Sequence, residues 1–113
     1  MKVKQKNKES VAVCCISGEI NLNSVSKLQG ILKKIIFDKQ RKVLLNLKDV
    51  EYIDSSGFAF LIQFSEELKS RQGVVFFSNL SPKIRSLFAI TKLDSVFKLY
   101  ETEQEALKDF YGY

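Results

Sequence analysis

The sequence has no histidine, and its only cysteines are the adjacent pair Cys14 and Cys15. Without histidine, a self-contained catalytic site of the Ser-His-Asp or Cys-His kind is impossible. Neighbouring residues of a strand point to opposite faces, so the two thiols cannot jointly hold a metal ion. We expect one buried and one outward-facing free thiol, and we predict that the protein is not an enzyme and binds no metal.

Several common binding patterns are also absent. The chain contains neither a G-x-x-x-x-G-K-[ST] phosphate loop nor a G-x-G-x-x-G dinucleotide motif, so we predict no cofactor. No apolar run reaches the ~18 residues of a membrane-spanning helix. The lysine-rich segment 1–10 is followed by short alternating residues that do not resemble a signal peptide, and we therefore expect a cytoplasmic protein.

The charge is positive but scattered. The 18 lysines and arginines outnumber the 13 acidic residues, which gives a net charge of +5. A nucleic-acid groove would more usually interleave basic residues with exposed aromatics on one element, whereas most of the nine phenylalanines fit core positions. We expect solvated lysines and no direct contact with nucleic acid, while an acidic protein partner is compatible with the charge.

The apolar pattern predicts strands that alternate with helices. The predicted strands span residues 2–8, 11–16, 43–47, 74–77 and 96–100. The predicted helices begin within 21–24 and end at 37, and span 54–69, 82–91 and 103–110. This order implies mostly parallel β–α units, and hence a single α/β domain, residues 1–113, with a mixed sheet of about five strands and about four helices.

One stretch, Asp54-Ser55-Ser56-Gly57, joins a buried strand to an amphipathic helix. Aspartate and serine are ordinary capping residues for a helix start. A glycine so early in a helix lowers helix propensity, and we interpret Gly57 as leaving the Ser56 hydroxyl uncrowded at a helix end that favours negative charge.

Helical angles place Ser56, Phe60 and Gln63 opposite the apolar stripe of this helix. We therefore expect Ser56 on the solvent side of the first turn, above an exposed Phe60, in a contact surface. A second turn, predicted at residues 18–21, also follows a strand. Because function gathers at the carboxyl ends of strands in sheets of this type, the two turns are expected to share one edge.

Four motifs occur in order along the chain: residues 18–21 (GEIN), residues 46–57 (NLKDVEYIDSSG), residues 88–97 and residues 103–107. Together they resemble the STAS domain, and closely the bacterial anti-sigma-factor antagonists. Gly18-Glu19-Ile20-Asn21 matches the family's G-E-[LI]-D turn, and residues 46–57, NLKDVEYIDSSG, match its strand-to-helix signature. Residues 88–97 resemble its pattern before the last strand, and residues 103–107 resemble its final acidic helix. The likeness covers the chain after Val11.

The resemblance implies a STAS-type fold and a partner-switching role. Such an antagonist binds an anti-sigma factor that is also a serine kinase, which releases the sigma factor. The kinase phosphorylates the serine before the glycine, here Ser56, and a serine phosphatase reverses the step. Partner contacts are expected at Asn21, Asp54, Ser55, Gly57, Phe60 and Gln63.

Two departures from the family pattern bear on the choice of partner. Asn21 replaces the usual aspartate and so removes a negative charge near Ser56, and Phe58-Ala59-Phe60 is bulkier than the usual segment. Other interpretations stay open: Ser56 as a simple helix cap, or a STAS module without kinase control that binds a small ligand or serves a lipid-transport or stressosome-like assembly. The oligomeric state expected is a monomer or a weak dimer.

Overall fold

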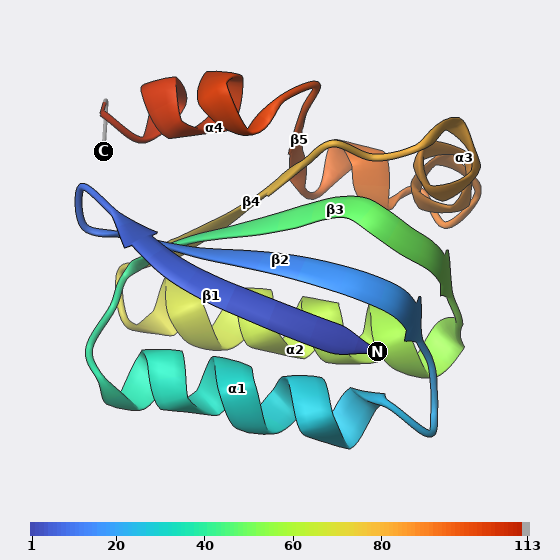
Figure 1. Ribbon diagram of the computed structural model, residues 1–113, viewed down its shortest axis with the longest axis horizontal. Coiled ribbons are helices and arrows are strands. Elements are labelled where there is room, and N and C mark those ends of the chain that lie inside the picture. Colours follow the sequence, from blue (N-terminus) through green and yellow to red (C-terminus); the bar gives the residue numbers. More distant parts are fainter. Residues whose placement is uncertain (112–113) are drawn as a thin grey trace.

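The five strands lie side by side in the order in which they occur along the chain, as Figure 1 shows. This computed structural model describes residues 1–111, so the last two residues of the predicted domain lie outside the described residues. The strands are β1 (Lys2–Lys8), β2 (Val11–Ile20), β3 (Lys42–Ile53), β4 (Val74–Ser78) and β5 (Lys98–Tyr100). β1 pairs antiparallel with β2, and every later pair is parallel.

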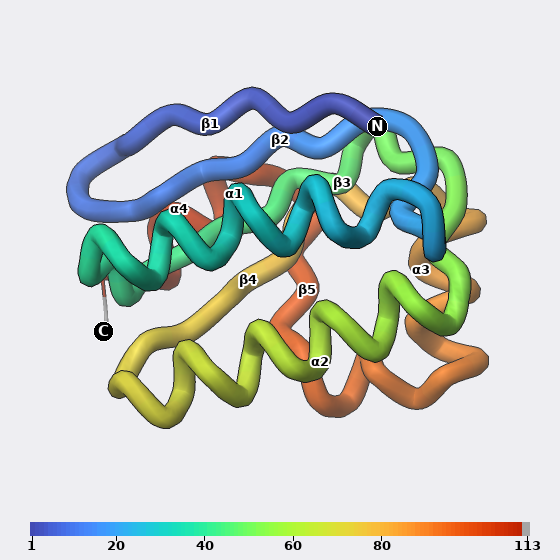
Figure 2. The backbone as a smooth tube through the Cα atoms, turned by 90° about the horizontal axis from the view of Figure 1, so that it is seen from below, coloured from blue at the N-terminus to red at the C-terminus, as the bar shows by residue number. Residues whose placement is uncertain are grey.

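Helices cover both faces of the sheet. They are α1 (Val25–Phe37), α2 (Ser55–Ser70), α3 (Pro82–Ile90) and α4 (Glu103–Phe110), and a short 3₁₀ helix spans Leu93–Ser95. Figures 1 and 2 show α1 and α2 side by side on one face, with α4 on the other. The expected single α/β domain with a five-stranded mixed sheet and four helices is confirmed.

The core has two unequal parts. The larger lies between the sheet and α1, α2 and α3, and its fully buried members include Ile16, Ile20, Leu28, Leu32, Leu61, Phe77 and Phe88. The smaller lies under α4 and consists of Val11, Val13, Leu44, Phe76, Ala106 and Phe110. The apolar side of α2, the helix that Asp54 caps, is therefore buried in the larger part of the core.

The two long strands extend further than their sequence pattern predicts. The prediction of a turn at residues 18–21 is wrong for residues 18–20, because β2 continues to Ile20. Its pairing with β3 shifts register between Cys15 and Ser17 and again between Gly18 and Glu19, and Gly18 has φ +90°. Such bulges break the alternation of apolar and polar residues, so the strand seems to end early in the sequence.

The two cysteines are unpaired and point to opposite faces of β2, as expected. Cys14 is buried in the larger core, and Cys15 is half-buried against the smaller one. Burial, followed by the neighbouring Cys15, raises the pKa of the Cys14 thiol to about 12. Cys14 is thus a protonated core residue and not a reactive thiolate.

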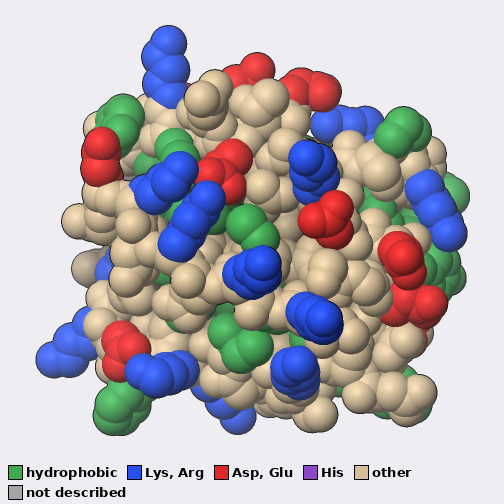
Figure 3. Space-filling model, in the orientation of Figure 1, with side chains coloured by type: hydrophobic (Ala, Val, Ile, Leu, Met, Phe, Trp, Pro, Cys, Tyr) green, Lys and Arg blue, Asp and Glu red, His purple; other side chains and the backbone are tan. Residues whose placement is uncertain are grey.

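The positive charge has no single focus. The four lysines of β1 (Lys2, Lys4, Lys6 and Lys8) are exposed along the sheet edge. Figure 3 shows Lys and Arg side chains spread over the face of the molecule seen in Figure 1, with acidic side chains among them. Within residues 1–111, no helix is long and apolar enough to cross a membrane.

Glu103 ties the last helix to the far edge of the sheet. Its Oε1 accepts a hydrogen bond from Asn46 Nδ2 at 3.1 Å, and its Oε2 lies 3.2 Å from Lys6 Nζ and 3.4 Å from Lys8 Nζ. Partial burial acts to raise the pKa of Glu103, but the hydrogen bonds from Asn46 and Lys6 and the charge of Lys6 outweigh it, so the pKa is lowered. The charged carboxylate therefore stabilises the packing of α4.

We predict that Glu103→Gln lowers the free energy of unfolding by about 1 kcal/mol at pH 7. A lowered folded-state pKa stabilises the fold fully above the ordinary value of 4.5, and this contribution is lost as the pH falls from there through the folded pKa. Urea titrations at pH 7 and at about pH 3 should show that the difference in unfolding free energy between wild type and Glu103→Gln is smaller at the lower pH.

The matched control is Glu105→Gln, which removes the same charge from the same first helical turn at an exposed position without a recorded ion pair. Equal stability of the two variants at pH 7 would contradict the role assigned to Glu103.

Candidate functional site

The carboxyl ends of β2 and β3 meet at one corner of the molecule. The Asp54 N–H donates to Ile20 O at 3.1 Å, which joins the end of β3 to the end of β2 directly before α2 begins. The loop of residues 21–24 leaves β2 at the same corner. The expectation that the two turns share one edge is therefore confirmed, with the first turn beginning at Asn21.

Asp54 uses both carboxylate oxygens to hold this corner. Oδ1 accepts from the Gly57 N–H at 2.9 Å and so caps α2. Oδ2 accepts from the Leu22 N–H at 3.1 Å, across to the loop that follows β2. The cap is the one expected from the sequence, whereas the tie to Leu22 joins residues 32 positions apart and has no local sequence signal.

Gly57 is required by close packing. A Cβ at this position would lie 2.6 Å from Ile20 O and 2.8 Å from Ile53 Cγ2. Gly57 therefore lets α2 start against the end of β2, which the sequence analysis did not foresee, and its effect on the Ser56 hydroxyl stays a prediction. Because Gly57 is buried, it can serve a partner only by fixing the turn.

The two serines of the turn differ in exposure. Ser55 is exposed and Ser56 is half-buried, so Ser56 is less open than expected. Within residues 1–111, neither hydroxyl has a recorded hydrogen bond, and the capping oxygen belongs to Asp54. Ser56 is therefore not the helix cap, and its hydroxyl has no structural duty that phosphorylation would disrupt.

The prediction that Phe60 is exposed is wrong. Phe60 is half-buried, packs against the larger core and stacks on Phe64 with ring centroids 6.3 Å apart. Helical angles alone assign this side of α2 to solvent, but α1 lies beside it on the same face of the sheet. Phe60 consequently lies between the two helices. Of Phe60 and Gln63, only Gln63 is exposed.

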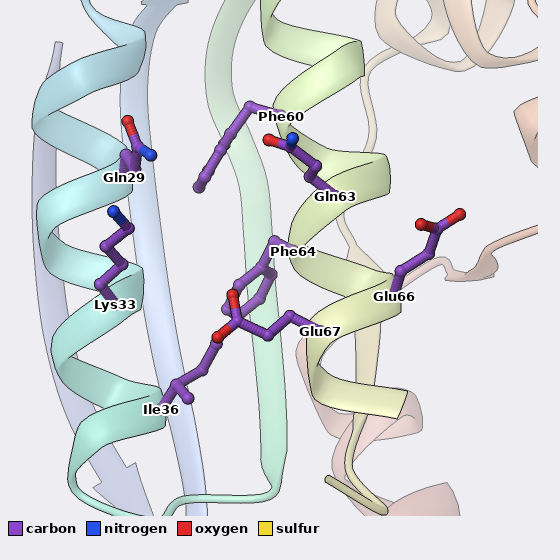
Figure 4. Close-up of a pocket in the computed structure, with 8 residues that line it drawn as sticks. All are labelled: Gln29, Lys33, Ile36, Phe60, Gln63, Phe64, Glu66 and Glu67. Atoms are coloured by element: carbon purple, nitrogen blue, oxygen red, sulfur yellow. The ribbon is translucent and has the colours of Figure 1, made fainter. Parts of the chain in front are cut away.

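A groove of about 410 Å³ runs between α1 and α2. It is lined by Gln29, Lys33, Ile36, Phe60, Gln63, Phe64, Glu66 and Glu67. In Figure 4, Phe60 and Glu67 point from α2 toward α1, and Lys33 runs along α1 toward Gln29. The groove has an aromatic and aliphatic floor with charged side chains at its rim.

Asn21 shapes the loop that follows β2. Its Oδ1 accepts from the Asn23 N–H at 3.0 Å and from the Ser24 N–H at 3.2 Å, and its carbonyl oxygen accepts from the Val25 N–H at 2.8 Å. Between the two asparagines, Leu22 leaves 71% of its surface exposed, which the sequence analysis missed. The available signal was a leucine inside an otherwise polar loop.

Nothing at this corner resembles a metal centre. Within the described part of the chain, no three His, Cys, Asp or Glu side chains are grouped to hold an ion. The corner offers a hydroxyl, a fixed carboxylate and an apolar side chain on rigid backbone. That set suits docking and covalent modification.

Comparison with known proteins gives consistent matches. Residues 2–106 match the model of the STAS domain. An anti-sigma-B factor antagonist of Staphylococcus aureus is 29% identical, over 80% of this chain and 84% of that protein. The crystal structure of an anti-sigma factor antagonist from Mycobacterium paratuberculosis has a TM-score of 0.87 at 26% identity, and the match covers 96% of this chain and 92% of that one.

The fold is also that of the anti-sigma factor antagonist SpoIIAA. Its unphosphorylated form has a TM-score of 0.84 at 22% identity, covering 99% of this chain and 98% of that one. The phosphorylated form of the Bacillus SpoIIAA has a TM-score of 0.75 at 22% identity, covering 96% and 99%.

We predict that Gly57→Ala lowers the free energy of unfolding by about 2 kcal/mol, because the added methyl group meets backbone at the end of β2. Gly30→Ala is the matched control: this exposed glycine lies within α1, and a Cβ there meets nothing within 4 Å. It should raise stability by up to about 1 kcal/mol. Chemical denaturation measures both, and a Gly57→Ala variant as stable as wild type would refute the packing argument.

Proposed function

The chain belongs to the STAS-domain family of anti-sigma factor antagonists, and we propose that it controls a sigma factor by partner switching. Proteins of this family are non-enzymatic regulators. In the proposal, the unphosphorylated chain binds an anti-sigma factor that is also a serine kinase, and so frees the sigma factor in the cytoplasm. Phosphorylation of Ser56 ends this binding, and a serine phosphatase restores it.

The observation that carries the proposal is the position of the Ser56 hydroxyl. It lies in the first turn of α2, it has no recorded hydrogen bond within residues 1–111, and the cap of the helix is supplied by Asp54 instead. A phosphate here would add about 1.5 to 2 negative charges without removing any internal contact. The helix N-terminus favours negative charge, so the fold can keep its shape.

The phosphate would then change the affinity for the partner and not the fold of the chain. A dianion at a dry interface must lose its water, which disfavours binding unless a cation of the partner meets it. A cost of about 3 kcal/mol would weaken binding more than a hundredfold. That SpoIIAA occurs in both an unphosphorylated and a phosphorylated form supports a phosphorylation switch for this chain.

Ser56 is preferred to Ser55 although Ser55 is more exposed. The family pattern points to the serine directly before the glycine, which is Ser56. A kinase that docks on the corner held by Asp54 can reach a half-buried hydroxyl that is less accessible to a kinase without this docking contact. The proposal thus makes the selectivity a consequence of docking.

We predict that Ser56→Asp folds as wild type and binds its kinase at least a hundredfold more weakly, whereas Ser56→Ala binds normally and accepts no phosphate. The anti-sigma-factor serine kinases encoded in the source genome would be purified and titrated in turn by calorimetry, and phosphate would be located by mass spectrometry. Ser55→Ala is the matched control and should still be phosphorylated. Wild-type affinity of Ser56→Asp, or phosphate on Ser55 alone, would refute the assignment.

The groove between α1 and α2 favours one second candidate, a STAS module that binds a small ligand without kinase control. Its volume of about 410 Å³ and its mixed lining would suit a small amphipathic molecule. Incubation with each kinase and ATP separates the two functions, because only the partner-switching protein gains phosphate at Ser56.

A further inference from the structure

We propose that the loop between β2 and α1, residues 21–24, docks on the partner through the apolar side chain of Leu22, and that Asn21 only shapes this loop. The inference rests on the proposed function and names a contact residue for the same corner. It moves the contact from the polar position expected from the sequence to its apolar neighbour.

The side chains of Asn21 and Ser24 already make hydrogen bonds that shape the loop. The Asn21 side-chain oxygen accepts from two backbone N–H groups, at 3.0 and 3.2 Å. The Ser24 hydroxyl donates to Glu19 O at 2.7 Å and accepts from the Asn21 N–H at 2.9 Å. A partner that recruited these groups would first have to break the turn, so the loop offers them poorly for binding.

Leu22 is the opposite case. Its side chain is 71% exposed, while its backbone is held by the 3.1 Å hydrogen bond to Asp54 Oδ2. An apolar side chain on a backbone that is already ordered loses little further conformational freedom when it docks. Leu22 is therefore a preformed anchor for an apolar pocket.

The same carboxylate places this anchor beside the modified serine. Asp54 joins Leu22 through one hydrogen bond and precedes Ser56 by two residues. A partner that docks on the Ser56 turn is therefore well placed to contact Leu22 as well. Asn21 carries no charge, so the contact proposed for this loop is an apolar pocket for Leu22, while the exposed carboxylate of Glu19 lies beside Asn21.

The other end of α1 supplies a matched control. Phe37 is 83% exposed and lies at the end of α1 opposite to this loop. Phe37→Ala removes more apolar surface than Leu22→Ala, yet it leaves the Ser56 corner untouched. Asn21→Asp is the second control, because a carboxylate can accept the same two backbone hydrogen bonds, although it loses the exposed 3.4 Å hydrogen bond from Asn21 Nδ2 to Glu19 Oε1.

The test titrates each purified anti-sigma-factor serine kinase of the source genome with four forms of the chain by calorimetry. We predict that Leu22→Ala weakens binding tenfold or more, while Phe37→Ala and Asn21→Asp stay within twofold of wild type. Thermal melts verify that the variants fold. In a methyl-labelled sample, the Leu22 resonances should shift when kinase is added, while those of the buried Leu28 and Leu32 stay in place.

The outcomes separate the two hypotheses. If Ser56→Asp loses binding but Leu22→Ala keeps it and the Leu22 methyl groups do not shift, the contact is wrong and the proposed function stands. If Asn21→Asp loses tenfold or more while Leu22→Ala does not, the loop docks through its polar residue. If no kinase binds the wild-type chain, the proposed function fails and this inference fails with it.

Discussion

The carboxylate of Asp54 is the interaction on which the rest of the corner depends. One oxygen caps α2 through Gly57, and the other holds the loop after β2 through Leu22. A single side chain therefore fixes two segments that are distant in sequence, and it does so at the sheet edge where both strands end. With the cap supplied by Asp54, Ser56 has no structural duty of its own, and a regulatory group can be added there without rebuilding the helix start.

The fold makes such a corner possible by bringing α2 close to β2. The start of α2 lies so close to the end of β2 that there is no room for a side chain at position 57. The apolar side of α2 packs in the larger core, which holds the helix in place. In the proposed function this local rigidity matters, because a charge added at Ser56 would act on the docked partner rather than on the surrounding backbone. A binary switch of partners needs this separation between stability and recognition, because the protein must stay folded in both states.

The sequence predicts the architecture well, because the relevant signals are local. Apolar periodicity located the four α-helices of the described residues, although not the short 3₁₀ helix, and Asp54 caps α2 as its position suggests. Failures occurred where the outcome depends on contacts between distant segments. Phe60 faces α1 instead of solvent, and Gly57 is required by its close contact with Ile20. The bulged end of β2 resembles a turn when its sequence is considered alone. The exposure of Leu22 had a local signal, a leucine inside a polar loop, but its hydrogen bond to Asp54 could not be foreseen, since no pattern links residues 22 and 54.

The most direct test of this account compares the backbone amide spectra of the chain with serine and with phosphoserine at position 56, the latter introduced during synthesis so that no kinase is needed. The account predicts shifts confined to residues 20–24 and 54–60, with the amides of Leu22 and Gly57 still protected from exchange. Shifts spread through β2, β3 and β4, or loss of protection at Leu22, would contradict it, because phosphorylation would then act by changing the fold.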